Sequence, residues 1–194
     1  MDNKEYKLPY DSFIGGWFID DKICDNLISF YKQNNKESAE GPVFINNKAT
    51  VNKSIKESND LVLSSDYFEY PINEYRISLQ KCLGKYINKY KYVNSHDKFN
   101  VEHSYSIQYY PPKGGYKKWH FENATKQTST RVLVFMTYLN DVKEGGTEFY
   151  HQKLKINAEK GLTLCWPSDW THTHRGVISE KQNKYILTGW LNYE

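Results

Sequence analysis

The chain has 194 residues and a mass of 23.0 kDa, a length that suits a single domain. Hydrophobic residues make up 39% of the sequence and aromatic residues 16%. This is enough apolar surface for a core and argues against intrinsic disorder. The net charge of +3 is too balanced for electrostatic binding to nucleic acid, so no nucleic-acid partner is expected.

The sequence also argues against a membrane or exported protein. No apolar run approaches the roughly 18 to 20 residues that cross a bilayer, and residues 1–5 are polar and do not resemble a signal peptide. The three cysteines, Cys24, Cys82 and Cys165, have no metal-like spacing, which excludes a disulfide scaffold and a cysteine zinc site. We therefore expect a cytoplasmic protein with no membrane partner.

The first half of the chain carries two helical patterns. A short apolar stripe, made of Ile23, Leu27, Ile28 and Phe30, predicts one helix. A second helix is expected to begin near Pro71, because proline is tolerated in the first turn, with a stripe that continues to Tyr90. Between them, residues 34–66 are polar and predict a long loop, in which residues 43–45 and 61–63 are candidate short strands.

From about residue 99 the pattern changes to short β-prone runs separated by turn residues. The predicted strands are 101–107, 131–139, 147–151, 153–156, 162–166, 173–178 and 185–191. Many short strands in about a hundred residues predict an antiparallel barrel or jelly roll. The expected architecture is α+β and compact, with residues 1–98 forming a helical support and residues 99–194 forming the β-core.

One histidine and one carboxylate lie two residues apart in this second half. His120 and Glu122 would project from the same face of a strand, and His174 on a later strand is a candidate third ligand, with His172 as its close rival. Two histidines and one carboxylate suit non-haem Fe(II). An isolated triplet of this kind is also common on exposed strands. The remaining candidates, His96, His103 and His151, are weaker and are expected at the surface or in packing.

Several further short motifs follow one another in this half of the sequence. His174 is followed by Gly176, and Lys184 lies ten residues after His174. The chain also carries Tyr138-Leu139-Asn140, then Glu144-Gly145-Gly146-Thr147-Glu148-Phe149, and finally the run from Lys184 to Trp190. From about Tyr105 to Trp190 the sequence resembles the 2-oxoglutarate-dependent Fe(II) oxygenases of the prolyl 4-hydroxylase type.

This resemblance implies a double-stranded β-helix, that is, a jelly-roll or cupin-like core, and it assigns roles to individual residues. His120, Glu122 and His174 would hold the iron, and the Gly176 spacing favours His174 over His172. Lys184 would pair with the far carboxylate of 2-oxoglutarate. The other implied contacts are Tyr110 and Tyr138, which would donate hydroxyl hydrogen bonds to 2-oxoglutarate, Thr188 and Trp190, which would line the pocket, and Trp119, a candidate contact beside the ligand. For Tyr138, Trp166 and Trp190, plain core packing is the alternative.

The implied cofactors are Fe(II), 2-oxoglutarate and O₂, with ascorbate as a further candidate. The implied reaction converts 2-oxoglutarate to succinate and CO₂ while hydroxylating a C–H bond, first of all on a prolyl residue of a peptide or protein. A small-molecule substrate stays open. The loop at 34–66 and residues 113–118 are candidate lid elements, although solubility is a simpler explanation for their lysines.

One departure from the family pattern is the glutamate at position 122, where aspartate is usual. The extra methylene adds a torsion that must be fixed. We expect metal binding to be retained, while activity is left open. The alternatives from other classes are a non-catalytic metal- or sugar-binding jelly roll, and a cupin-type metal-dependent hydrolase or isomerase. Lys184 and the two tyrosines discriminate against the first alternative, because a simple metal-binding barrel needs no dicarboxylate anchor, whereas zinc or manganese activity independent of O₂ and 2-oxoglutarate would favour the second. The oligomeric state is not indicated by the sequence.

Overall fold

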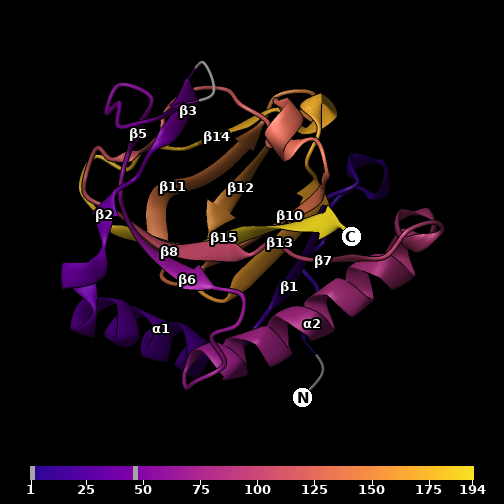
Figure 1. The fold of residues 1–194 in the computed structure, drawn as a ribbon, viewed down its shortest axis with the longest axis horizontal. Helices are drawn as coiled ribbons and strands as arrows, with labels where there is room; N and C mark the ends of the chain where they lie inside the picture. Colours follow the sequence, from indigo (N-terminus) through magenta and orange to yellow (C-terminus); the bar gives the residue numbers. More distant parts are fainter. Residues whose placement is uncertain (1–2, 46–47) are drawn as a thin grey trace.

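The computed structural model describes residues 3–45 and 48–194, which form two facing β-sheets with two helices on one side (Figure 1). The helices are α1 (Asp21–Gln33) and α2 (Ile72–Lys89). The strands of the second half are β7 (Phe99–Val101), β8 (Ser104–Tyr110), β9 (Gly115–Tyr116), β10 (Arg131–Tyr138), β11 (Val142–Phe149), β12 (Leu154–Ala158), β13 (Leu162–Pro167), β14 (His174–Gly176) and β15 (Lys184–Tyr193). Those of the first half are β1 (Gly15–Phe18), β2 (Ala39–Glu40), β3 (Val43–Ile45), β4 (Lys48–Thr50), β5 (Lys56–Glu57) and β6 (Asn59–Ser64).

The larger sheet has eight strands in the order β1-β13-β10-β15-β8-β6-β2, with β7 also paired to β15. The smaller sheet has the order β12-β11-β14. Every pairing among these strands is antiparallel. The predicted α+β architecture, with a jelly-roll core and helices packed on the sheet, is therefore confirmed.

The helices form where their apolar positions recur at helical spacing. Asp20 caps α1 by accepting a hydrogen bond from the Lys22 amide, and the helix fully buries Cys24, Leu27 and Tyr31. The predicted stripe is shifted slightly, because Ile23, Ile28 and Phe30 are only partly buried. The longer helix begins after Pro71, as predicted, and buries one face made of Ile72, Tyr75, Leu79, Cys82 and Tyr86.

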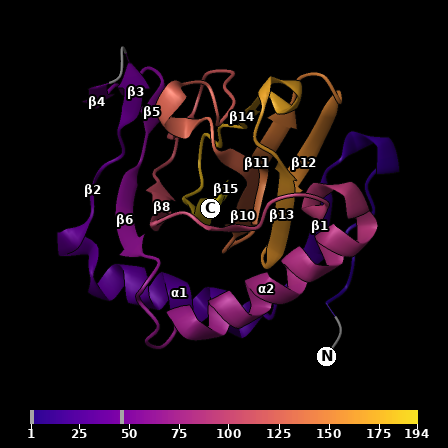
Figure 2. The ribbon, with the colours of Figure 1, turned by 45° about the vertical axis from the view of Figure 1, so that its right-hand side comes forward.

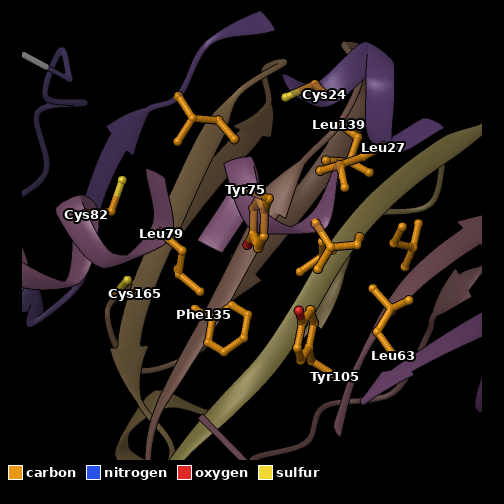
Figure 3. Close-up of a cluster of buried hydrophobic side chains, with 14 of the residues drawn as sticks. Cys24, Leu27, Leu63, Tyr75, Leu79, Cys82, Tyr105, Phe135, Leu139 and Cys165 are labelled. Atoms are coloured by element: carbon orange, nitrogen blue, oxygen red, sulfur yellow. The ribbon is translucent and has the colours of Figure 1, made fainter. Parts of the chain in front are cut away.

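This face of α2 lies on the larger sheet (Figure 3). Phe135 of β10 packs beneath it and is fully buried. Tyr75 places its hydroxyl 3.0 Å from Thr137 Oγ1, which in turn lies 2.8 Å from Thr163 Oγ1. The buried hydroxyls are thus paired with one another, so the helix is fixed on the sheet by both apolar packing and polar bonds.

The first third of the chain contains more regular structure than its composition predicts. The predicted strands at 43–45 and 61–63 are confirmed as β3 and β6, but the rest of residues 34–66, apart from 46–47, which lie outside the described residues, is not an irregular loop. Strands β2, β4 and β5 and a short 3-10 helix, η2 (Asn35–Glu37), also lie there. Strand β1 was missed as well. The strands that were missed are very short or contain adjacent glycines, so no alternating apolar pattern marks them.

The strands of the second half were largely predicted, with shifted ends. The run 101–107 is divided into β7 and β8, and the run 147–151 belongs to β11, which begins at Val142 and ends at Phe149. Both helices lie together on one side of the molecule, while β14 and the β3–β4 hairpin lie opposite (Figure 2). No helix in residues 3–45 and 48–194 is both long and apolar enough to cross a membrane.

Candidate active site

The backbone brings His120, Glu122 and His174 together at one edge of the smaller sheet. His120 and His174 are directly opposite each other in an isolated antiparallel bridge, with N–O distances of 2.9 and 2.8 Å in the two directions. The Glu122 amide donates to Ser168 O at 2.8 Å. Main-chain hydrogen bonds therefore fix the positions of all three residues independently of their side-chain contacts.

The three side chains converge on one point. Glu122 Oε1 lies 3.3 Å from His120 Nε2 and 3.4 Å from His174 Nε2, and one donor atom from each residue lies within 4.8 Å of the others. No other group of three histidines, cysteines or carboxylates in the described part of the chain meets this condition. His120 and Glu122 do converge, but the predicted strand is absent: His120 forms an isolated bridge and Glu122 lies in the turn that follows it, and this turn directs the carboxylate back to the histidines.

The ring nitrogens that point away from this group determine the tautomers. His120 Nδ1 lies 3.0 Å from Lys118 O, and His174 Nδ1 lies 2.9 Å from His172 O. A carbonyl oxygen can only accept, so each Nδ1 carries a proton and, in the neutral ring, each Nε2 presents a lone pair. Two imidazole lone pairs and a carboxylate oxygen then face one another, an arrangement that repels unless a cation lies between them.

The pKa directions agree with a cation site. Burial and the neighbouring His174 lower the pKa of His120, which favours its neutral, ligating form. Burial alone would raise the pKa of Glu122, but hydrogen bonds and positive charge from protonated His120 and His174 rings outweigh burial and hold that pKa well below the usual value. A cation bound between neutral rings would act in the same direction. The His120 ring is also stacked on Tyr116, with ring centroids 3.6 Å apart and planes 12° apart. Burial raises the pKa of Tyr116 to about 12, so that phenol stays neutral.

The second carboxylate oxygen of Glu122, Oε2, is held by residues that no sequence motif links to the two histidines. Trp190 Nε1 donates to Glu122 Oε2 at 2.9 Å. Arg131 stacks over the Trp190 ring, with its guanidinium carbon 3.6 Å from a ring centroid, and pairs with Glu102 at 3.0 Å. Trp190 was expected to line the pocket; it does so, and its main polar contact is this carboxylate.

Lys184 lies in the same cavity as the histidines and is only 6% exposed. Its Nζ donates to Val177 O at 3.2 Å and lies 5.1 Å from the Tyr110 ring centroid. None of the carboxylates that the structure describes pairs with it. Burial lowers the pKa of Lys184 to about 8, because a buried ammonium without an anion is costly.

The other predicted pocket residues line the same cavity as this lysine. Tyr138 and Thr147 place their hydroxyls 2.6 Å apart, the Tyr110 hydroxyl donates to Gln108 Oε1, and Thr188 Oγ1 donates to Phe135 O at 3.0 Å. The hydroxyls of the two tyrosines therefore already have protein partners. Tyr110, Tyr138 and Thr188 line one cavity of about 640 Å³, which also contains the three converging side chains.

The first half of the chain contributes a buried ion pair that sequence reasoning missed. Lys56 Nζ lies 2.6 Å from Asp60 Oδ2, and Ser58 Oγ donates to Asp60 Oδ1 at 2.7 Å. Lys56 and Asp60 line the cavity and are each 6% exposed. They come from the polar stretch at 34–66, where a lysine four residues before an aspartate carries no signal of burial.

The rival histidine lies elsewhere. His172 is buried in the short 3-10 helix η5 (Trp170–His172), with Nε2 2.9 Å from Ser12 O and Nδ1 2.9 Å from Thr171 Oγ1. It lines a different cavity. Trp119 lies in the wall of the main cavity and is 39% exposed.

Comparison with known proteins agrees with this geometry. Residues 105–192 match the sequence model of the 2OG-Fe(II) oxygenase superfamily. No curated protein matches the chain. A prolyl-4-hydroxylase from Pseudomonas putida is similar in structure over 95% of this chain and 97% of its own, with a TM-score of 0.69 and 14% identity.

Two further solved structures share the fold. A viral collagen prolyl hydroxylase from Paramecium bursaria Chlorella virus-1, in its 2OG complex, aligns over 100% of this chain and 97% of its own, with a TM-score of 0.64 and 19% identity. A Trichoplax adhaerens prolyl hydroxylase in complex with a hypoxia-inducible-factor peptide fragment aligns over 91% and 80%, with a TM-score of 0.67 and 16% identity. Residues 105–192 are therefore similar in sequence to the 2OG-Fe(II) oxygenase superfamily, and the fold of the chain is that of prolyl 4-hydroxylases.

Proposed function

We propose that the protein is an Fe(II)- and 2-oxoglutarate-dependent dioxygenase that hydroxylates a prolyl residue in a polypeptide and releases succinate and CO₂. One observation carries the proposal: a cation site shares one cavity with a buried ammonium that pairs with none of the described carboxylates. His120, Glu122 and His174 supply the first, and Lys184 supplies the second.

The donor set fits Fe(II). Two neutral imidazoles and one carboxylate on one side of a metal leave coordination positions for other ligands, which is the arrangement of non-haem iron oxygenases. The Nδ1 hydrogen bonds to Lys118 O and His172 O orient both rings. Iron held there would supply the activation of O₂ and the oxidative decarboxylation of the cosubstrate.

Lys184 gives the cavity its preference for a dicarboxylate. A carboxylate that reaches Lys184 Nζ would remove the cost of the buried charge. The hydroxyls of Tyr110 and Tyr138 line the same cavity and would turn toward that carboxylate. This pairing favours the oxygenase over a cupin-type hydrolase or a sugar-binding jelly roll, because neither requires an anion at the far end of the cavity.

The similar solved structures and the size of the cavity both support a prolyl residue of a polypeptide as the substrate. The similar solved structures are prolyl hydroxylases, one of them with a bound peptide fragment. The cavity of about 640 Å³ exceeds what a five-carbon dicarboxylate needs. Its remaining wall, which contains Lys56, Asp60 and Trp119, would face the substrate. We propose that residues 99–194 supply the ligands and residues 1–98 support them and close this wall.

The experiment is an anaerobic titration of the metal-free protein with Fe(II) and then with 2-oxoglutarate, followed by visible absorption. The expected result is a charge-transfer band that His174→Ala abolishes and His151→Ala, an exposed histidine, preserves. A prolyl peptide would then gain one oxygen atom as succinate forms. Iron binding without the band would favour the non-catalytic or hydrolytic jelly roll, and iron binding in His174→Ala would refute the ligand set.

A further inference from the structure

Four aromatic side chains form a continuous exposed strip that begins at the active-site cavity. The strip consists of Trp119, Tyr150, His151 and Trp170. Adjacent rings have centroids 5.2, 5.2 and 6.0 Å apart, in chain order, and each pair is nearly perpendicular, at 80°, 84° and 83°. Tyr150 is 58% exposed and Trp170 is 62% exposed. Single exposed aromatics are ordinary, but rings gathered on one surface mark an interaction site.

The strip is held in place by backbone contacts between the segments that carry it. Tyr150 N donates to Thr173 O at 2.8 Å, and Gln152 Nε2 donates to Thr171 O at 3.0 Å. These bonds join the β11–β12 turn to η5. At the other end, Trp119 directly precedes His120, whose amide is bonded to His174 O. The rings are therefore positioned before any partner arrives, which lowers the entropy cost of binding.

The two ends of the strip open into different cavities. Trp119 lines the cavity that contains His120 and Lys184. Trp170 and His151 line a second cavity of about 570 Å³, together with Phe13 and Pro9. Phe13 is itself 49% exposed. A ligand that reached out of the active-site cavity past Trp119 would thus meet an apolar path that ends in a second pocket.

The ring geometry identifies the occupant. Perpendicular neighbours in edge-to-face contact make a ridged apolar surface rather than a flat platform, and Arg175 covers one face of Trp119 at 4.4 Å while its own charge is paired with Glu148 at 2.8 Å. A sugar needs an open ring face against which it stacks in parallel. A ridged apolar surface suits an extended polyproline II chain, whose side chains protrude as regular ridges without internal hydrogen bonds.

We propose that the polypeptide substrate continues from the reacting residue across the aromatic strip in an extended conformation, and that an apolar residue of it, such as proline, occupies the pocket between Trp170 and Phe13. The inference rests on the proposed function and deepens it. It means that substrate selection depends on sequence at a distance from the hydroxylated residue.

The test compares two peptides with the same central proline. One has about three residues, and the other is a proline-rich peptide of about 15 residues, which spans about 45 Å in the polyproline II form. The proteins are the wild type, Tyr150→Ala/Trp170→Ala, and Tyr92→Ala as a control. Tyr92 is 91% exposed on η3 (Lys91–Asn94), at the end of α2. Peptide affinity is measured by calorimetry on the Mn(II)-loaded protein without O₂, and KM and kcat are measured with Fe(II).

For the long peptide, the double variant should lose affinity and raise KM by about tenfold or more, with kcat unchanged. The short peptide and the Tyr92→Ala protein should show no change. If the wild type and the double variant have equal affinity and KM for the long peptide, the strip does not bind substrate, and the proposed function is unaffected. If binding depends on the strip but the peptide is not hydroxylated, the strip is a peptide-binding surface and the prolyl substrate is refuted. Stronger binding of an oligosaccharide than of the long peptide would overturn the proposed occupant.

Discussion

Trp190 Nε1 donates a 2.9 Å hydrogen bond to Glu122 Oε2, while the other oxygen of the same carboxylate faces both histidines. In the proposed iron site, this bond would compensate for the glutamate that stands where the family usually has aspartate. The additional methylene gives Glu122 one more torsion to fix, and the indole N–H holds Oε2, which leaves Oε1 facing the two histidines. Arg131, which stacks over Trp190 and pairs with Glu102, supports the indole in turn.

Trp190→Phe removes that donor and keeps most of the ring. Loss of an outer-shell partner of a metal ligand typically lowers metal affinity about 10- to 100-fold, and a loss in this range is expected in competition titrations with Fe(II) or Mn(II). Trp170→Phe, the same change at an exposed position, is the control and should bind metal normally. Wild-type affinity in Trp190→Phe would show that the bond does not orient Glu122.

A double-mutant cycle separates this orientation from a general loss of packing. Glu122→Asp withdraws the carboxylate by one methylene, so that one side chain can no longer reach both the metal and Trp190. Trp190→Phe should then lower metal affinity much less in the Glu122→Asp protein than in the wild type. Additive effects of the two changes would contradict a direct coupling between the residues.

The two neighbouring histidines should behave differently. His174→Ala is expected to abolish metal binding, because it removes one of three donors. His172→Ala should leave metal affinity unchanged and lower the free energy of unfolding by about 1–3 kcal/mol, because Ser12 O loses a buried donor. Metal titration and chemical denaturation of both variants measure the two effects. Loss of metal binding in His172→Ala alone would invert the assignment.

Lys184→Ala should weaken 2-oxoglutarate binding by about 30-fold or more, equivalent to about 2 kcal/mol, because the dicarboxylate then enters without its charge partner. Metal affinity should not change. Calorimetric titration of 2-oxoglutarate into the Mn(II)-loaded protein measures the loss. An unchanged cosubstrate affinity would exclude Lys184 as the anchor.

The same lysine predicts a pH dependence. Burial lowers the pKa of Lys184 from 10.5 to about 8, so the ligand-free folded protein releases this proton near pH 8 and the unfolded chain releases it near 10.5. Between these values the unfolded state holds more protons, and this residue alone makes stability rise with pH. Binding a carboxylate requires the ammonium form, so 2-oxoglutarate affinity should fall as pH rises above about 8.

Calorimetry of 2-oxoglutarate binding across this pH range, in buffers of different ionisation enthalpy, tests the proton uptake. Lys184→Arg is the matched control, because arginine stays protonated throughout. Its affinity should show no such decline. An equal decline in both proteins would assign the titration to another group.

The packing of α2 predicts a difference in stability between its two faces. Leu79 packs against the sheet and is 3% exposed (Figure 3), whereas Ile77 lies on the outer face of the helix and is 56% exposed. Leu79→Ala should lower the free energy of unfolding by about 2–5 kcal/mol, and Ile77→Ala by about 0.5 kcal/mol or less. Urea denaturation of the two variants compares them. Similar losses would mean that the helix is not held by this face.

The sequence by itself determined the β-rich second half, the two helices and the positions of the residues that converge in the cavity. Alternation and helical spacing are local, so they identify β10, β15 and α2 without knowledge of the fold. The two-residue spacing of His120 and Glu122 is local as well. The order of the short motifs from Tyr105 to Trp190 supplied the remaining candidates, His174 and Lys184.

Only the tertiary structure decided which side chains complete the site. Arg131 reaches both the Trp190 ring and Glu102 because β10 pairs with β15, and because Glu102, which directly follows β7 on the other edge of β15, donates its amide hydrogen to Trp190 O. Lys56 and Asp60 enter the cavity because β5 pairs with β9 and β6 with β8. These contacts join residues far apart in the sequence, and the short polar segments that make them carry no periodic signal. Burial and pairing depend on the whole fold, so the polar residues that it encloses could not be distinguished from solvated ones beforehand.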